Sequence, residues 1–271
     1  MSAGWRRIHG PQKLFSINLF AWEPLMKAVL TAIAFALSTS ASFAATNTLT
    51  GTVRDFNADG QNFEGTIIGQ LNGLVETTLT GASPTLTVFG KTKINETNFN
   101  QWFTKSTLGE VMSHSITLDD AGHPGTFTYA SSSFFPIDLQ LLGNESRNHN
   151  FHFTYNIAAE FGYKPGTGQT FTFTGDDDVW VFFDKKLGID LGGVHGAQGK
   201  SVNLDTLMSG KAKGNYALDF FFAERHTTQS NLRIDTSLTL TTAVPEPETY
   251  ALMLAGLSAI GIVARRRRAA A

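Results

Sequence analysis

The sequence predicts an all-β fold for residues 45–243, an antiparallel β-sandwich with long loops. Phe is used 22 times and fills short segments together with β-branched residues, a composition typical of strands. Many of these segments alternate, and in residues 170–174 two Phe share one face and three Thr the other. Gly, Asn, Asp and Ser separate the segments, and helical periodicity is poor, so packed sheets are the expected architecture.

Eight segments are predicted to be strands, and two short stretches, 96–103 and 204–209, are helix candidates. The predicted strands cover 48–56, 85–90, 125–130, 150–161, 169–175, 179–184, 216–224 and 231–240. Residues 179–183 are expected to form a hairpin with 187–191 across a turn at Lys185 and Lys186. Both faces of 179–183 are apolar, so this strand should lie inside the sandwich.

The charge distribution excludes one class of partner. Eight basic and three acidic residues lie in 1–44 and 244–271, which leaves 13 basic and 20 acidic residues in 45–243 and a net charge of −7 there. Nucleic-acid binding needs a basic face, so no nucleic acid is expected. Cysteine is absent, which excludes disulfides and thiolate metal sites.

The N-terminal segment predicts export. Met26 and Lys27 precede an apolar stretch and small residues that end near Ala44, the pattern of a secretory signal peptide over 26–44. Glu23 and Pro24 would interrupt a longer signal, so residues 1–25 are interpreted as an extension ahead of a true start at Met26. The core domain is then 45–243.

The C-terminal segment 244–271 predicts a sorting signal. Pro245, Glu246 and Pro247 precede 15 apolar or small residues, 250–264, and the basic cluster Arg265, Arg266, Arg267 and Arg268 follows. The stretch is short for a membrane span, but the basic cluster favours a short transmembrane helix with its end in the cytoplasm. The three features together resemble a PEP-CTERM sorting signal. That resemblance implies an exosortase as partner, a Gram-negative source that makes extracellular polysaccharide, and at least transient attachment to the inner membrane.

Residues 175–184, GDDDVWVFFD, hold the candidate site, because three carboxylates precede the most apolar strand. Asp176, Asp177 and Asp178 could cap a turn. They could instead bind a hard cation such as Ca²⁺, which takes six to eight oxygen ligands and would offset their repulsion. Glycoside hydrolysis by paired carboxylates is a third alternative, but adjacent aspartates point apart along an extended chain. His149 and His152, three apart on a strand, likewise point apart and predict no metal pair.

A second resemblance spans residues 51–240. The segments GTVRDF at 51, SFFPID at 133, NFHFTYNIAAEFGY at 150, GDDDVWVFFDKKLGIDLGGVHG at 175 and YALDFFFAERHTTQSNLRIDT at 216 together resemble a fibro-slime domain, a relative of the PA14 domain. The resemblance implies a PA14-like β-sandwich of surface and matrix proteins, linked to carbohydrate binding or adhesion.

The resemblance also implies particular metal ligands. PA14-type lectins hold Ca²⁺, which in turn binds sugar hydroxyls, with two consecutive aspartates that are often joined by a cis peptide. Asp177 and Asp178 match that pair, with Asp176 as the extra residue. Glu224 stands where those lectins have Asn, and His226 and Thr228 are candidates for loop carbonyl ligands. Arg225 could instead neutralise the aspartates, which would give an ion pair without metal.

Two functions are favoured as expectations, and neither is an enzyme; a third, a glycoside hydrolase, is disfavoured. The first is an exported, surface-sorted protein of the extracellular or biofilm matrix that binds carbohydrate through Ca²⁺ held by Asp177, Asp178 and Glu224, with a glycan or matrix polysaccharide as partner. The second is a structural matrix protein in which calcium or an Arg–carboxylate pair only stabilises loops. Glu224 favours keeping the second alternative, because its added charge could exclude a sugar.

Overall fold

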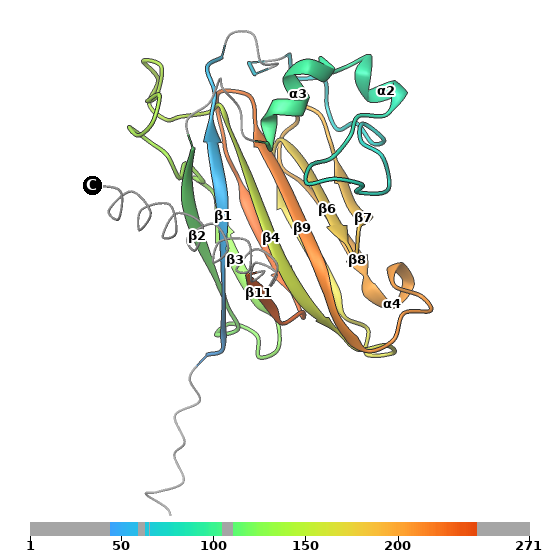
Figure 1. Ribbon diagram of the computed structural model, residues 1–271. Helices are drawn as coiled ribbons and strands as arrows, with labels where there is room; N and C mark the ends of the chain where they lie inside the picture. Colours follow the sequence, from blue (N-terminus) through green and yellow to red (C-terminus); the bar gives the residue numbers. More distant parts are fainter. Residues whose placement is uncertain (1–43, 59–62, 65, 105–110, 243–271) are drawn as a thin grey trace, which may run out of the picture. The chain divides into compact units, whose positions relative to one another are not determined.

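The computed structural model describes residues 44–58, 63, 64, 66–104 and 111–242, which all belong to one compact unit beginning at Ala44 (Figure 1). This part of the chain is mostly β, and the predicted fold class is confirmed. Its elements are β1 (Thr46–Asp55), α2 (Val88–Lys91), α3 (Glu96–Trp102), β2 (Val111–Asp119), β3 (Phe127–Ser131), β4 (Phe153–Tyr163), β5 (Thr170–Gly175), β6 (Asp178–Phe183), β7 (Lys186–Leu191), β8 (Gln198–Asn203), α4 (Leu204–Leu207), β9 (Gly214–Glu224), β10 (Leu232–Thr236) and β11 (Leu240–Thr242).

The strands are hydrogen-bonded in the order β7-β6-β9-β4-β1-β2-β3-β10-β5-β8, and β11 pairs with β4. All the pairings are antiparallel. This path bends back on itself, because β5 faces β6 and β9 across one core. The ring of Phe171 lies 5.5 Å from that of Phe183, and the rings of Phe173 and Phe220 are 5.8 Å apart. The layers therefore form the predicted sandwich around an aromatic interior.

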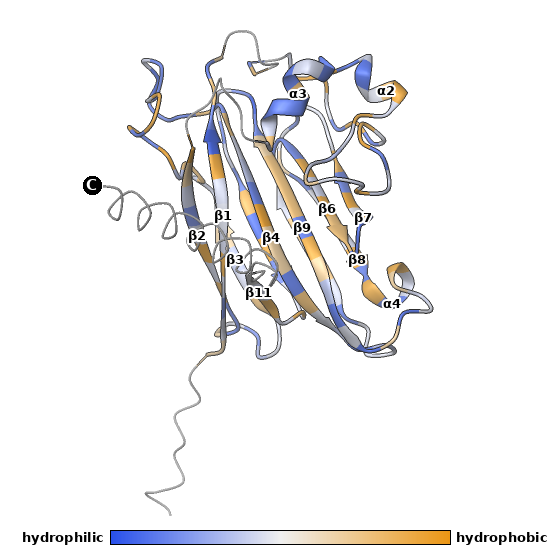
Figure 2. Cartoon of the chain, viewed as in Figure 1, coloured by the Kyte–Doolittle hydropathy of each residue, from blue (hydrophilic) through white to orange (hydrophobic). Residues whose placement is uncertain are grey.

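Strand β6 is buried on both faces, as its sequence predicts. Val179, Val181 and Phe183 belong to the core between the layers, whereas Trp180 and Phe182 belong to a second apolar cluster. That cluster is covered by the segment between β1 and β2 that includes α2 and α3 (Figure 1). The apolar residues of β4, β6 and β9 appear in orange in Figure 2. Burial on both sides fixes the start of β6, and with it the three aspartates.

The predicted strand at 85–90 is wrong. Residues Val88–Lys91 form helix α2, because the side chain of Thr87 accepts a hydrogen bond from the N–H of Gly90 and caps a helical turn. Strands β2 and β8, both largely polar, were not among the predicted segments. The helix candidates at 96–103 and 204–209 are confirmed as α3 and α4.

The turn of the predicted hairpin falls one residue earlier than expected. Asp184 and Lys185, with φ of 49° and 69°, connect β6 to β7, and Lys186 already belongs to the return strand.

The predicted terminal segments 1–25, 26–44 and 244–271 lie outside the described residues, apart from Ala44. Within the described part, none of the helices has the length and apolar character needed to span a membrane.

Candidate functional site

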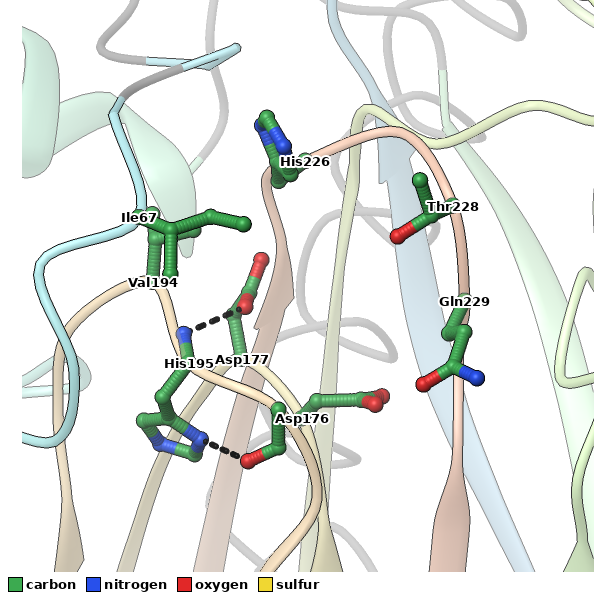
Figure 3. A pocket seen from close by; sticks show the side chains of 9 residues that line it. Ile67, Asp176, Asp177, Val194, His195, His226, Thr228 and Gln229 are labelled. Atoms are coloured by element: carbon green, nitrogen blue, oxygen red, sulfur yellow. Dashed lines mark hydrogen bonds between the residues drawn. The ribbon is translucent and has the colours of Figure 1, made fainter.

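A small pocket of about 60 Å³ lies where β5 passes into β6 (Figure 3). Its walls come from the β5–β6 junction, the loop after β7, the loop after β9 and one residue of the segment that follows β1. The lining residues are Ile67, Asp176, Asp177, Val194, His195, Gly196, His226, Thr228 and Gln229. Loops distant in sequence therefore meet at one rim of the sandwich.

Asp176 is 3% exposed, and both of its carboxylate oxygens are hydrogen-bonded. The backbone N–H of Asn231 donates to Oδ1 (2.6 Å), and the Asn231 side-chain amide donates to Oδ2 (2.7 Å). Burial raises the pKa of Asp176 above its ordinary value, although the hydrogen bonds from Asn231 oppose the shift. The residue thus links the start of β6 to the loop before β10.

Asp177 follows through a cis peptide bond between Asp176 and Asp177. The backbone N–H of His195 donates to its Oδ1 and that of Arg225 to its Oδ2, each at 3.0 Å. Burial, and next the nearby charge of Asp178, raise the pKa of Asp177 to about 7, against the effect of Arg225. Asp177 holds the loops after β7 and β9 against the pocket.

Asp178 is the member of the trio that pairs with a cation. Arg225 Nε donates to Asp178 Oδ2 at 2.5 Å, and the N–H of Gly193 donates to Oδ1 at 2.6 Å. The guanidinium of Arg225 also lies over the ring of Trp102, 5.0 Å from its centroid. The ion pair considered for Arg225 from the sequence is therefore present, and Asp178 is its acid.

Glu224 ends β9 and is 1% exposed. Its Oε2 has no hydrogen-bond partner in the structure. Burial, followed by the charges of Asp177 and Asp176, raises the pKa of Glu224 well above its ordinary value. A buried carboxyl oxygen without a partner is costly, and a bound cation or water is one way to satisfy it.

The structure brings four of the six sequence-predicted site residues to one pocket: Asp176, Asp177, His226 and Thr228 line it. Asp178 and Glu224 are not among its lining residues. The resemblance implied that Asp177 and Asp178 form the consecutive pair with a cis bond. The cis bond instead joins Asp176 and Asp177. These two residues line the pocket, and Asp178 does not.

No set of three or more acidic or histidine side chains within the described residues is arranged to hold a metal ion. Side chains of Asp177, Asp178 and Glu224 therefore do not converge as a ready set of three ligands. A cation here would need loop carbonyls and water besides the carboxylates, which is an ordinary ligand set for Ca²⁺.

Unsatisfied polar atoms gather at this rim. In the part of the chain that the structure describes, five buried side-chain nitrogen or oxygen atoms have no hydrogen-bond partner. Four of them belong to residues at the pocket or on the strand and loop beside it: His195 Nε2, Glu224 Oε2, His226 Nδ1 and Ser230 Oγ. Two of the four atoms are oxygens, those of Glu224 and Ser230, and a water or a cation is one way to satisfy them.

Sequence reasoning missed part of the lining. His195 belongs to the segment LGGVHG, but what it donates to Asp177 is its backbone N–H, which no residue pattern reveals. Ile67 and Gln229 gave no signal, since their place at the pocket depends on how distant loops meet.

Comparison with known proteins confirms the C-terminal resemblance. Residues 243–268 match the PEP-CTERM protein-sorting motif. This motif implies sorting by an exosortase, and with it export to the cell surface or beyond.

The described domain has relatives in Dictyostelium discoideum. The chain is 43% identical over 159 residues to protein psiQ, covering 53% of this chain and 16% of that protein. It is also 43% identical over 157 residues to protein psiD, covering 54% of this chain and 30% of psiD. The chain thus spans less than a third of the length of these relatives. The matches are consistent with the resemblance to fibro-slime proteins.

Two solved structures show a looser likeness. The PA14 domain of the MpAFP antifreeze protein aligns with a TM-score of 0.33 and 11% identity, over 76% of this chain and 87% of that one. The epithelial adhesin 6 A domain from Candida glabrata, solved with Galβ1-3GlcNAc, gives a TM-score of 0.28 and 15% identity, over 77% and 85%. Likeness at this level says nothing of what this chain binds.

Proposed function

We propose that this chain is an exported, surface-sorted adhesion protein that binds carbohydrate through a calcium ion at the Asp176–Asp177 pocket. The observation that carries the proposal is the surplus of buried carboxyl groups over cationic side chains at this rim. Four carboxyl groups lie there, Asp176, Asp177, Asp178 and Glu224, and Arg225 is ion-paired with Asp178. A calcium ion would compensate the negative charge of Asp176, Asp177 and Glu224 in their ionised forms.

The size of the pocket favours a ligand that stays outside it and contacts the ion with only a few of its groups. Its volume of about 60 Å³ has room for an ion and its water but not for an enclosed sugar ring. A glycan would therefore reach the ion with hydroxyl groups from outside. The lining offers Thr228 and Gln229 for hydrogen bonds to it, and Ile67, 59% exposed, offers an apolar surface.

A second function, favoured by the Arg225–Asp178 ion pair, is that of a structural matrix protein. In that case the carboxylates only tie loops together, as the hydrogen bonds from His195, Arg225 and Asn231 already do. Calcium would raise the melting temperature without creating a glycan site.

Isothermal titration of the purified full chain with CaCl₂ tests the cation. We expect binding in the wild type and a loss of at least tenfold in affinity in Asp177→Asn, because one charged ligand is removed from the pocket. Asp119→Asn, an exposed carboxylate at the end of β2, is the matched control and should bind as the wild type does.

A wild-type chain that takes up no calcium at millimolar concentration contradicts the proposal, as does an Asp177→Asn variant with unchanged affinity. A glycan array probed with and without calcium then separates the two functions. Calcium-dependent glycan binding supports the first, and a blank array with a calcium-raised melting temperature supports the second.

A further inference from the structure

His152 occupies a buried position between two glutamates next to the pocket. It is 1% exposed, and its Nδ1 lies 2.5 Å from Glu145 Oε2 while its Nε2 lies 3.0 Å from Glu64 Oε1. Each ring nitrogen of His152 therefore faces a carboxylate oxygen of a different glutamate.

Both glutamates have further partners besides His152. Burial acts to raise the pKa of Glu64, but hydrogen bonds from His152 and Thr227 hold it below its ordinary value, so Glu64 is ionised. Glu145 is also paired with Arg147 Nη1 at 3.2 Å, and Arg147 Nη2 lies 3.8 Å from Glu64 Oε1. Arg147 and His152 thus each contact both glutamates.

Glu64 in turn holds the pocket loop. The backbone N–H of Thr227 donates to Glu64 Oε1 at 3.0 Å, and Arg225 O accepts from the N–H of Glu64 at 2.6 Å. His226 Nδ1 lies 3.5 Å from Glu64 Oε2. His226 and Thr228, the neighbours of Thr227, line the pocket. One carboxylate therefore fixes the loop between β9 and β10 on its outer side, while Asp177 fixes it from inside.

His152, Glu64 and Glu145 together form a clamp, which joins segments that are far apart in the sequence. Glu145 accepts a hydrogen bond from the N–H of Ala58 at 3.0 Å and thereby ties the loop before β4 to the end of β1. His152 and Glu64 continue the chain of contacts to the loop after β9. Loops that contribute no lining residue are in this way coupled to the pocket.

We propose that His152, held between Glu64 and Glu145, acts through Glu64 as a positioning group for the pocket loop and so sets the affinity of the pocket for its cation. The inference rests on the proposed function for the cation, but the clamp itself can be tested without any ligand. Neither Glu64 nor His152 lines the pocket, so both act through the loop.

The test compares four variants of the full chain, Glu64→Ala, Glu64→Gln, His152→Gln and the control Glu96→Ala. Glu96 forms an exposed ion pair with Lys91 at 2.8 Å, so the control also removes an ion pair but leaves the clamp intact. Hydrogen–deuterium exchange of the peptide that contains Thr227 is followed without calcium, and calcium affinity is measured by titration.

We expect exchange in this peptide to be at least tenfold faster in Glu64→Ala, because the acceptor for the Thr227 N–H is gone. Glu64→Gln should restore part of the protection, since its amide oxygen still accepts that bond. Calcium affinity should fall about tenfold in Glu64→Ala and less in Glu64→Gln, with Glu96→Ala unchanged in both measurements. His152→Gln should follow Glu64→Ala in direction.

Unchanged exchange in Glu64→Ala overturns the clamp, whatever the calcium result. Faster exchange with unchanged calcium affinity overturns the positioning role but leaves the proposed function standing. If the wild type binds no calcium, the proposed function fails and the link to affinity fails with it, while the exchange data still decide whether the clamp exists. A Glu64→Ala chain that does not fold is replaced in each comparison by Glu64→Gln.

Discussion

At the scale of single residues, the site is a set of acids held in place by hydrogen bonds more than by opposite charges. The backbone N–H groups of His195 and Arg225 donate hydrogen bonds to Asp177, and that of Asn231 donates to Asp176. Such bonds favour the ionised carboxylate, but burial outweighs them, and the pKa of Asp177 rises to about 7. The protonation of this residue therefore changes near neutral pH.

The raised pKa of Asp177 gives the stability a pH dependence with a definite sign. Between its unfolded pKa near 4 and its folded pKa of about 7, the folded chain holds a proton that the unfolded chain has lost. Stability without calcium should therefore fall as pH rises from 5 to 7.5, by up to about 1.4 kcal/mol per pH unit for this group. Asp55, with a pKa raised by burial to about 6, adds in the same direction.

Urea unfolding of the full chain at pH 5, 6 and 7.5, with EDTA present, checks this prediction. Asp177→Asn should reduce the slope, and saturating calcium should remove the part that belongs to Asp177, because a bound cation takes the place of the proton. A stability that rises over this range in the absence of calcium would contradict the assignment.

Glu224 supplies a sharper discriminator between the two proposed functions. Burial raises the pKa of Glu224, so near neutral pH this carboxyl takes up a proton on folding; Glu224→Gln removes that cost, and we expect a higher melting temperature without calcium at pH 7.5. If the carboxylate belongs to the cation site, the same variant should show a smaller rise in melting temperature on adding calcium. Thermal melts with EDTA and with calcium measure both effects, and an unaltered calcium response would exclude Glu224 from the cation site.

At the scale of elements, the rim depends on a strand covered from two sides. Trp180 is fully buried beneath α3, where the ring of Phe99 lies 5.7 Å away. The segment that contains α2 and α3 is therefore packed into the second apolar cluster and helps to bury β6. Loss of this packing should destabilise β6, the strand that follows the aspartates.

Replacing Phe99 with Ala tests that dependence. Phe99 is 1% exposed, and large-to-small changes at such positions typically cost about 3–5 kcal/mol. Phe89→Ala, on the neighbouring helix α2 and 44% exposed, is the matched control and should change stability by about 0.5 kcal/mol or less. Equal effects in urea unfolding of the two variants would show that the cover does not support β6.

Prediction of the strands from the sequence succeeded for residues 179–183 and failed for residues 85–90. The two-faced burial of 179–183 follows from its residues alone, because no exposed strand can present Val, Trp and Phe on both sides. Residues 85–90 have an equally strand-like composition, yet a side-chain cap by Thr87 makes part of them helical. Propensity alone does not weigh such a local bond.

At the scale of the whole domain, the sequence located the site but not its internal arrangement. Three adjacent aspartates ahead of a buried strand were sufficient to predict a rim of fixed carboxylates. Which two open to the pocket depends on the direction of each side chain and on Arg225, whose partner only the fold selects. The contacts of His152 with Glu64 and Glu145 join residues up to 88 positions apart, beyond the reach of any local pattern.

The pairing of β11 with β4 sets how far the C-terminal end of the described domain lies from the pocket. Thr242 lies opposite Ala159, six residues along β4 from Phe153, which lies opposite Glu224. At a rise of about 3.3 Å per residue, the root of the sorting tail is ~20 Å from the strand end beside the pocket. Strand β1 likewise begins nine residues from Asp55, the partner of Phe153. Both ends of the described domain, Ala44 and Thr242, therefore lie well away from the rim that holds the pocket.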